Sequence, residues 1–445
     1  MTKQSEQTIY ALSTAPGKAG VAIIRVSGPR ALNSLCALCS FDKNPTPRVA
    51  YFKKIIDPST NETIDQALIL YFKNPHSFTG EDCAEYHIHG GKAIINRMLD
   101  VLSAQDDHRM AEAGEFTRRA FDNDKIDLTQ AEAIADLIDA QTTVQHKQAI
   151  IQADGKLSAL YASWRTQMIK VLAFSEAHLD FPDEDDIPDT LTPEIENMIT
   201  TLTHDLRDHL NDNHRGERLR DGIKIAIIGA PNAGKSTLLN TLAKREVAIV
   251  SPIKGTTRDV LELPMDIKGY PVILYDTAGI REIGTDDNSV IEGEGIKRAL
   301  SKASTADLIL HMIDSTDPTH LDINDALEPK TMTVYNKAEG TLGVKEKGIY
   351  ISALSEDGIK PLLDTLITHI DGLYALREQP SLTRARHREF LNKSLSCLEN
   401  ATSEHALELL SENLRQAAFY ICKITGHIDV EDLLDVIFGE FCVGK

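Results

Sequence analysis

The chain has 445 residues, which is more than one hydrophobic core usually supports, so two or three domains are expected. Its 42% hydrophobic and 26% charged residues are typical of a soluble globular protein. The formal charge of −20 excludes a chain whose whole surface attracts nucleic acid, so such contact would need a local basic patch or a basic partner. The N-terminus, MTKQSEQTIY, has no secretion-signal pattern, and no apolar run approaches the roughly 18 residues that span a bilayer. We therefore expect a cytoplasmic protein that does not contact membranes.

Residues 1–122 alternate short strand-like runs with turn residues and two helical stretches. The runs Val21–Val26 and Ala67–Phe72 are strand-like, while Lys92–Leu102 has the apolar periodicity of a helix. This pattern predicts a small α+β domain at the start of the chain.

Residues 123–217 are almost continuously helical in pattern, and the stretch Ile150–His178 continues the one-sided apolar pattern of Ala131–Ile138. Long amphipathic helices return in residues 378–445, for example over Leu407–Leu414. These last helices have wide apolar faces but too few partners to fold alone. We therefore expect them to pack on the earlier helices, so that an α/β domain (218–377) is inserted into a discontinuous helical domain.

The α/β region begins with a phosphate-binding loop. The buried-strand pattern Ile223–Ile228 runs directly into Gly229-Ala-Pro-Asn-Ala-Gly-Lys-Ser236, and a helix is expected over Thr237–Leu242. Glycines let the backbone amides curl around phosphate groups, and the helix N-terminus adds its positive dipole end. In such a loop Lys235 reaches the outer phosphates and Ser236 offers a hydroxyl to Mg²⁺.

Four further segments indicate GTP rather than ATP. Each lies where the sequence of small GTPases has a nucleotide contact, and three of them directly follow a predicted strand. They are Gly255-Thr-Thr257, Asp276-Thr-Ala-Gly279, Asn336-Lys337 and Ser352-Ala-Leu354. In order and spacing they resemble the magnesium-binding and guanine-reading elements of that class.

The guanine-reading segment departs from the usual Asn-Lys-x-Asp pattern, because this chain has Asn336-Lys-Ala-Glu339. An aspartate accepts two hydrogen bonds from the guanine edge, and the longer glutamate must bend them or withdraw. Losing a good bidentate contact to a base costs on the order of 1–3 kcal/mol. We predict that GTP is still preferred to ATP, with weaker affinity than an aspartate would give.

The residue that orients the attacking water must also differ from that of Ras-like enzymes. The position that carries their glutamine is Ile280, whose side chain cannot form a hydrogen bond. The loop that follows offers five acids instead: Glu282, Asp286, Asp287, Glu292 and Glu294.

Seven motifs together resemble one family, the tRNA modification GTPases called MnmE or TrmE. They are the phosphate-binding loop, Val250–Asp259, Asp276–Arg281, Ser77–Asp82, Ala113–Phe116, Asn123–Leu128 and the C-terminal Phe441-Cys-Val-Gly-Lys445. The resemblance covers all regions of the chain. It implies an N-terminal α+β folate-binding-like domain, a discontinuous helical domain and an inserted Ras-like P-loop GTPase domain.

The resemblance also implies the nucleotide and metal contacts. K⁺ would take the place of an arginine finger and bind Asn232, Ser251, Ile253 and Thr256, while Mg²⁺ would bind Ser236 and Thr257. Glu292 would position the water, with Glu294 as the alternative. The full set of expected GTP contacts is Asn232, Ala233, Gly234, Lys235, Ser236, Thr237, Ser251, Pro252, Ile253, Lys254, Gly255, Thr256, Thr257, Asp276, Thr277, Ala278, Gly279, Asn336, Lys337, Glu339, Ser352, Ala353 and Leu354.

A second site is implied in the N-terminal domain, which forms a homodimer in this family. A 5-formyl-tetrahydrofolate or related one-carbon folate would lie at the dimer interface and contact Arg25, Glu85, Lys125 and Lys445. Cys442 either takes part in the modification chemistry or is a packing cysteine, and the sequence leaves both open.

The reaction implied is the addition of a carboxymethylaminomethyl or aminomethyl group at C5 of the wobble uridine of certain tRNAs. It is carried out with an FAD-dependent partner subunit of the MnmG/GidA type in a heterotetramer, and that partner would supply much of the basic surface. Local basic candidates are Arg118-Arg119, Arg215–Arg220 and Arg384–Arg388. A ribosome-assembly GTPase would carry a basic RNA-binding domain, and a septin- or dynamin-like structural GTPase a long coiled coil or a membrane-binding face. Neither feature is visible.

Overall fold

The computed structural model forms two compact units, one of residues 1–135 with 422–445 and one of residues 136–421. The residues described are 7–41, 43–180, 193–245, 262–276, 303–317, 327–340, 342–377, 379–403, 407–426, 434, 437–439 and 441–444. None of the helices within these ranges is long and apolar enough to cross a membrane.

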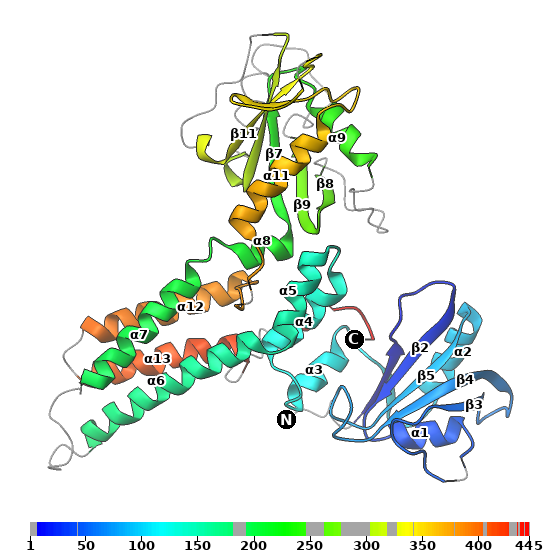
Figure 1. Ribbon diagram of the computed structural model, residues 1–445. Coiled ribbons are helices and arrows are strands. Elements are labelled where there is room, and N and C mark those ends of the chain that lie inside the picture. Colours follow the sequence, from blue (N-terminus) through cyan, green and yellow to red (C-terminus); the bar gives the residue numbers. More distant parts are fainter. Residues whose placement is uncertain are drawn as a thin grey trace, which may run out of the picture. The chain divides into compact units, whose positions relative to one another are not determined.

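The first unit is built on a six-stranded sheet in the order β3-β4-β5-β2-β1-β6 (Figure 1). Neighbouring strands are antiparallel except β1 and β6, which are parallel. The strands are β1 (Thr8–Leu12), β2 (Ala19–Ser27), β3 (Tyr51–Ile56), β4 (Thr63–Phe72), β5 (Cys83–Gly90) and β6 (His108–Met110). The helices are α1 (Ala31–Leu38), α2 (Lys92–Ser103), α3 (Glu115–Asp122) and the start of α4 (Leu128–Asp139).

The two faces of this sheet differ because side chains alternate along each strand. On one face Ile24, Ile69 and Tyr86 belong to a buried core that includes Leu35 of α1 and Met98 of α2. The residues that alternate with them point to the other face. The predicted strands and helix of this region are therefore confirmed as parts of an α+β domain.

The C-terminal end of the chain belongs to this first unit. Phe438 and Phe441 pack in a buried cluster with Leu128 of α4. Val443 forms an isolated β-bridge with Ala113. Farther on, the Ser13 hydroxyl donates to the carbonyl oxygen of Gly444 at 2.9 Å. The last described residues thus lie beside the end of β1.

The second unit contains a bundle of long helices from both ends of its sequence. Ser394 on α12 donates to the carbonyl of Ala417 on α13 at 3.0 Å, and Ser411 on α13 bonds to Ser175 on α6 at 3.0 Å. The later helices therefore pack on the earlier ones, as predicted. The helices are α5 (Thr143–Ala153), α6 (Lys156–Asp180), α7 (Pro193–Leu210), α12 (Ala385–Ser403) and α13 (Leu407–Thr425).

The stretch Ile150–His178, predicted to be helical in pattern, is divided between two helices, because α5 ends at Ala153 and α6 begins at Lys156. The N–H of Asp154 still donates to Ile150, but that of Gly155 donates to Gln152 and tightens the last turn. Aspartate and glycine are weak helix formers, which favours a break at this point.

The inserted α/β domain is a seven-stranded sheet in the order β12-β13-β11-β10-β7-β9-β8. Its five central strands are parallel, and the edge strands β8 and β12 are antiparallel to their neighbours. The strands are β7 (Ile223–Gly229), β8 (Glu262–Ile267), β9 (Tyr270–Asp276), β10 (Leu308–Asp314), β11 (Thr331–Asn336), β12 (Gly343–Lys345) and β13 (Gly348–Tyr350). The helices are α8 (Arg215–Asp221), α9 (Lys235–Ala243), α11 (Ile359–Tyr374) and the 3₁₀ turn η2 (Glu328–Lys330).

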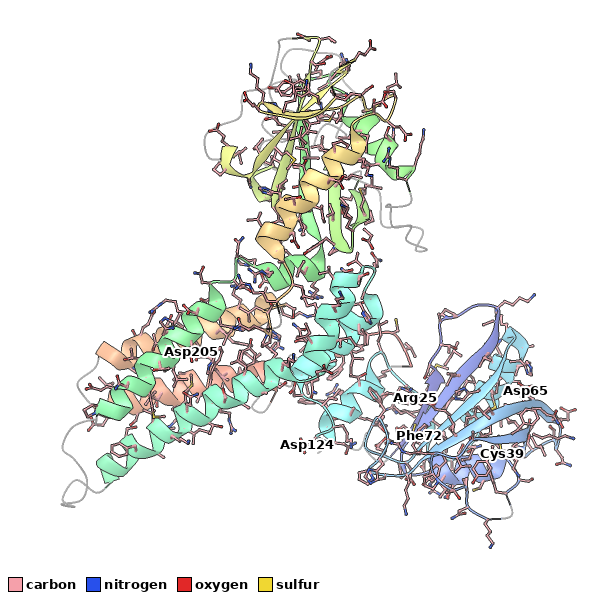
Figure 2. All side chains as sticks on the ribbon, viewed as in Figure 1. Arg25, Cys39, Asp65, Phe72, Asp124 and Asp205 are labelled. Atoms are coloured by element: carbon pink, nitrogen blue, oxygen red, sulfur yellow. The ribbon has the colours of Figure 1, made fainter. Side chains whose placement is uncertain are left out.

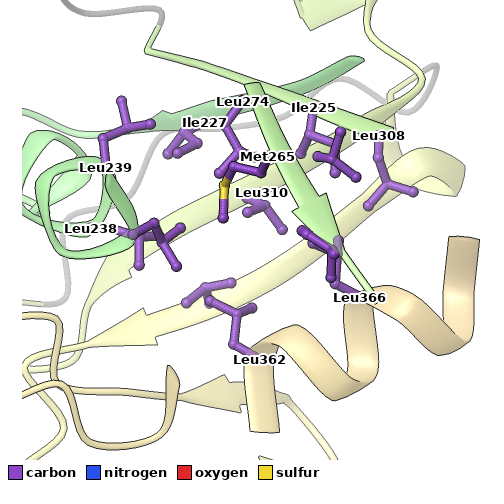
Figure 3. Close-up of a cluster of buried hydrophobic side chains, with 14 of the residues drawn as sticks. Ile225, Ile227, Leu238, Leu239, Met265, Leu274, Leu308, Leu310, Leu362 and Leu366 are labelled. Atoms are coloured by element: carbon purple, nitrogen blue, oxygen red, sulfur yellow. The ribbon is translucent and has the colours of Figure 1, made fainter. Parts of the chain in front are cut away.

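One face of this sheet forms the main core of the domain. Ile227 of β7 and Leu310 of β10 meet Leu238 of α9 and Leu366 of α11 in one buried cluster (Figure 3). This packing fixes α9, and therefore the loop before it, against the end of the sheet. The predicted mixed fold, with an α/β domain inserted in a discontinuous helical domain, is confirmed.

Helix α5 holds the two chain segments that connect the inserted domain to the helices. Three glutamines spaced along one side of α5 each donate a side-chain N–H to one of these segments. The bonds run from Gln145 to the Arg220 carbonyl (2.8 Å), from Gln148 to the Gly216 carbonyl (2.8 Å), and from Gln152 to the Ser381 carbonyl and the Thr383 hydroxyl (3.1 Å each). We call this set the glutamine clamp.

The two connecting segments also touch each other. A Cβ on Gly216 would lie 2.1 Å from the carbonyl oxygen of Leu382, so only glycine allows this approach. The carboxylate of Asp136 accepts from Arg220 on one segment at 2.9 Å and from Arg384 on the other at 2.7 Å. The junction is therefore tied by contacts from both segments.

We predict that Gly216→Ala lowers the thermal unfolding temperature by about 2–8 °C, because the added methyl group must push the two connecting segments apart. Differential scanning fluorimetry measures the shift. Gly372→Ala is the matched control, since Gly372 is also helical but a Cβ there meets no atom within 4 Å. That variant should unfold at the same or a higher temperature. Equal unfolding temperatures for both variants would contradict the close packing at Gly216.

Candidate nucleotide-binding site

The loops predicted to bind the nucleotide lie at one edge of the inserted sheet. Strands β7, β9 and β11 are parallel members of that sheet, and they end at Gly229, Asp276 and Asn336. Carboxyl ends of parallel strands meet at the same edge, which is where ligands bind in open α/β sheets. Asp276 is paired in register with Ile227, two residues before the phosphate-binding loop.

The phosphate-binding loop is folded against this edge. Helix α9 begins at Lys235, whose buried ammonium donates to the carbonyls of Gly229 and Ala230 at 2.8 Å each. A Cβ on Gly234, where φ is +95°, would lie 2.1 Å from the Asn336 amide nitrogen. The loop can therefore lie this close to β11 only because glycine occupies that position.

Asn336 joins three parts of the site. Its buried amide nitrogen donates to the carbonyl of Ala233 in the phosphate-binding loop at 2.8 Å. Its amide oxygen accepts the N–H of Ala353 at 2.9 Å, and the carbonyl of Ala353 accepts the Thr241 hydroxyl of α9 at 2.8 Å. The amide nitrogen carries two hydrogens, and the bond to Ala233 uses one of them. The sequence pointed to Asn336 as a nucleotide contact but did not reveal that it connects the loops.

Lys337 turns back toward the end of the neighbouring strand β10. Its ammonium lies 2.5 Å from the carboxylate of Asp314, which also accepts from the Thr316 hydroxyl at 2.7 Å. Hydrogen bonds from Lys337 and Thr316 lower the pKa of Asp314 to about 2, so the carboxylate is charged at neutral pH. Sequence reasoning missed Asp314, although it follows an apolar run just as Asp276 does.

Glu339 and Leu354, the two ends of the expected base pocket, are both exposed to solvent. Beside them, the Ala338 N–H donates to the Ile351 carbonyl and the Glu339 N–H donates to the Lys337 carbonyl, each at 3.1 Å. Ser352 pairs with Asp357 in a short bridge that shapes the second loop. The segments that would face a base are thus held by backbone contacts, while the Glu339 side chain stays accessible.

The tip of the phosphate-binding loop is also exposed. Asn232 lies there with φ of +63°, a conformation that asparagine tolerates better than most residues, and Ser236 is exposed in the first turn of α9. Within the described ranges, no group of three or more His, Cys, Asp or Glu could hold a metal ion. The other expected contacts lie outside the described residues: Ser251, Pro252, Ile253, Lys254, Gly255, Thr256, Thr257, Thr277, Ala278, Gly279, Glu292 and Lys445.

The second expected site lies on the sheet of the first unit, where Figure 2 labels Arg25. Arg25 and Glu85 are direct cross-strand partners on β2 and β5, and the guanidinium donates to the carboxylate at 3.0 Å. The rings of Phe78 and Phe116 lie 5.5 and 5.8 Å from the Arg25 guanidinium carbon. Stacking and ion pairing together hold this arginine in one orientation.

Lys125 and Cys442 belong to the same unit. The Lys125 ammonium donates to the carbonyl of Pro75 at 3.0 Å, and a Cβ on Gly80 would lie 3.2 Å from the Lys125 side chain. Lys125 therefore lies beside the loop that carries Phe78. Cys442 is exposed, and its carbonyl accepts the N–H of Gly114 at 3.5 Å.

The sheet face that carries Arg25 and Glu85 is rich in exposed apolar side chains. Phe52 and Leu68 are cross-strand partners, and Leu68 in turn pairs with His87, which shares a face with Glu85. The exposed fractions are 70% for Phe52, 38% for Leu68 and 55% for Val21, which lies on β2, the strand next to β5. Exposed apolar patches of this kind mark interaction surfaces.

The arginine clusters that sequence reasoning offered as a basic surface are largely engaged inside the protein. Each of four arginines has a carboxylate partner in its own unit. The pairs are Arg119–Glu81 (3.1 Å), Arg220–Asp136 (2.9 Å), Arg384–Asp136 (2.7 Å) and Arg388–Asp212 (2.6 Å). These arginines therefore stabilise the fold rather than present free positive charge.

Comparison with known proteins gives matches along the whole chain. The sequence model of the GTP-binding protein TrmE N-terminus matches residues 8–125, and that of the MnmE helical domain matches residues 128–442. The chain is 46% identical over 449 residues to the tRNA modification GTPase MnmE of Rickettsia typhi, covering 99% of this chain and 100% of that protein. It is 48% identical over 446 residues to the protein of that name from Parvibaculum lavamentivorans, with the same coverage.

Solved structures give more distant matches. A crystal structure of Era from Aquifex aeolicus bound to GDP and AlF₄⁻ is 27% identical, with a TM-score of 0.25, and the match covers 41% of this chain and 69% of that one. The G domain of the FeoB iron transporter of T. maritima is 21% identical, with a TM-score of 0.23, and the match covers 33% and 98%. The assignment rests on the sequence matches, which span all regions of the chain. The chain belongs to the tRNA modification GTPase family, MnmE/TrmE.

Proposed function

We propose that this GTPase hydrolyses GTP with the help of Mg²⁺ and K⁺. With an FAD-dependent partner subunit of the MnmG/GidA type, it would add a carboxymethylaminomethyl or aminomethyl group at C5 of the wobble uridine of certain tRNAs. The observation that carries the proposal is the junction at Asn336, which ties the phosphate-binding loop to the second base-reading loop in a chain that matches the family from end to end.

Each nucleotide-site residue has a defined task in this proposal. Lys235 and the first amides of α9 would hold the phosphates, and the hydroxyls of Ser236 and Thr257 would hold Mg²⁺. Asn232 would bind K⁺ together with Ser251, Ile253 and Thr256. A fixed cation there supplies positive charge beside the transferring phosphoryl group. The exposure of Asn232 at the loop tip fits this task.

Water activation would depend on Glu292, because Ile280 cannot orient a water molecule. A carboxylate can accept a hydrogen bond from the attacking water and hold it in line with the γ-phosphate. Glu294 is the alternative, two residues farther along the chain.

The one-carbon folate would bind on the sheet face of the first unit, between two copies of the chain. Arg25, held by Glu85 and two aromatic rings, offers a fixed cation to the ligand. The exposed apolar residues beside it favour burial against a second copy. Lys125 and Lys445 would complete the pocket, and the position of Gly444 beside β1 supports a contribution from the C-terminal lysine.

The tRNA would be bound largely through the partner subunit. The net charge of −20 opposes contact with a phosphate backbone, and the ion pairs of Arg220, Arg384 and Arg388 reduce the positive charge that the arginine clusters could offer. A heterotetramer of two copies of this chain and two copies of a basic partner satisfies both observations. Cys442, exposed near the chain end, remains available for the modification chemistry.

We predict that Asn232→Ala removes most of the stimulation of GTP hydrolysis by K⁺, because the side-chain oxygen that would bind the ion is lost. The measurement is the phosphate-release rate in KCl divided by that in NaCl at equal ionic strength. Asn240→Ala is the matched control, since Asn240 is exposed farther along α9. Retained K⁺ stimulation in Asn232→Ala would contradict the cation assignment.

We predict that Glu339→Asp tightens GDP binding about 5- to 100-fold, because the shorter acid restores two straight hydrogen bonds to the guanine edge. A fluorescent guanine nucleotide displaced by unlabelled GDP or ATP reports the affinity. Glu346→Asp makes the same change at an exposed position between β12 and β13 and should leave the affinity unaltered. Equal competition by ATP and GTP against the wild-type chain would argue against guanine selectivity.

We predict that Arg25→Ala abolishes wobble-uridine modification without changing GTP hydrolysis, because the folate pocket loses its fixed cation. Mass spectrometry of tRNA nucleosides from cells that lack this protein should show the modified uridine restored by the wild-type chain and not by the variant. Arg30→Ala, which removes an exposed arginine paired with Asp107, should restore it. Unchanged modification in cells that lack the protein would refute the proposed function.

A further inference from the structure

The end of strand β10 brings a carboxylate into the nucleotide edge of the sheet that the motifs do not include. Asp314 is the last residue of β10 and lies in register with Asn336, the last residue of β11. The backbone of β11 also holds the segment after β10, because the Ser315 N–H donates to the Asn336 carbonyl at 2.9 Å. Asp314 is thus fixed next to the segment that begins the guanine-reading motif.

Both oxygens of the Asp314 carboxylate are used. One accepts the Thr316 N–H at 3.0 Å and the Thr316 hydroxyl at 2.7 Å, which holds the carboxylate in a single rotamer. The other accepts the Lys337 ammonium at 2.5 Å. The Asp314 side chain is only 15% exposed, so it forms a rigid acceptor for the more exposed lysine.

Lys337 is consequently fixed at both ends. Its backbone, with φ of +59°, follows the buried and doubly hydrogen-bonded Asn336. Its ammonium is tethered to Asp314, so the four-carbon stem between them has lost most of its rotamer freedom. An unbranched apolar stem held beside the base-reading loops is suited to cover one face of a planar purine ring.

We infer that Asp314 is a positioning residue for the guanine nucleotide: it holds Lys337 so that the lysine stem forms one wall of the base pocket before the nucleotide binds. The inference rests on the proposed use of the segment Asn336–Glu339 as the guanine reader. A pre-formed wall raises affinity because less side-chain entropy is lost on binding. The Lys337 stem would contact the face of the base, whereas Glu339 would contact its edge.

A residue that positions Lys337 should affect the affinity for guanine nucleotide and not the rate of GTP hydrolysis. In the full-length chain, Asp314→Asn should weaken binding of a fluorescent GDP about 3- to 10-fold. The KM for GTP should rise by a similar factor while kcat stays within about twofold. The ratio of GDP to IDP affinity should stay at its wild-type value, because the bases guanine and hypoxanthine have the same purine ring face and differ only at the edge, where guanine carries a 2-amino group.

A double-mutant cycle tests whether the effect passes through Lys337. Lys337→Met keeps an unbranched apolar stem but removes the tether, so it should weaken GDP binding to a similar extent. In the Lys337→Met background, Asp314→Asn should cause no further loss. Asp364→Asn is the matched control, because Asp364 also forms an ion pair with a lysine, Lys268, at 2.7 Å in the same domain, although its side chain is more exposed than that of Asp314. That variant should bind GDP as the wild type does.

The outcomes separate this inference from the proposed function. Wild-type affinity in Lys337→Met or in a folded Asp314→Asn would overturn the positioning role, as would a full additional loss in the double variant. A changed GDP-to-IDP ratio in Asp314→Asn would also overturn it, because the residue would then act on the base edge. Failure of the wild-type chain itself to bind guanine nucleotide would overturn the proposed function instead.

Discussion

The arrangement of the second unit depends on one junction, where the two chain segments that connect the inserted domain to the helices are held together. The inserted domain leaves and rejoins the helices through segments that are far apart in sequence, and the glutamine clamp of α5 binds the backbone of both. Glutamine suits this task because its amide reaches past the helix surface and can donate to backbone carbonyls of another segment. Helix α5 also donates the Val144 N–H to Gly269, in the turn between β8 and β9, at 3.0 Å. One helix therefore contacts the helical connections and the nucleotide domain together.

At the nucleotide-binding edge of the sheet, single residues likewise connect several elements. Asn336 connects the phosphate-binding loop with the loop of Ala353, and the adjacent Lys337 connects β11 with β10. Nucleotide binding would then meet loops that already support one another, which lowers the entropy lost on binding. The departure at Glu339 falls on the exposed side chain of this segment, where a longer acid does not disturb the buried connections.

On the first unit, several apolar side chains on one face of the sheet are exposed to solvent, namely Val21, Phe52 and Leu68. Arg25 is held on this face by Glu85 and by aromatic rings, amid apolar side chains that are open to solvent. This composition would suit the proposed interface with a second copy of the chain and a charged ligand. The packing of Phe441 near Leu128 brings the end of the chain to the same unit.

The sequence by itself determined the fold class, the phosphate-binding loop and the order of the nucleotide motifs, because strand and helix periodicity and glycine spacing are local properties. The sequence pattern showed that this region is helical, while the structure decided that α5 and α6 are separate helices on either side of Asp154 and Gly155. Only the tertiary structure decided that Asn336 is a junction, that Asp314 meets Lys337, and that the glutamines of α5 bind two distant segments. Those contacts join residues on different elements, and no local pattern encodes which strand ends become neighbours when the sheet forms. The same reason explains why arginine clusters read as a basic surface became internal ion pairs: their partners lie far away in sequence and close in space.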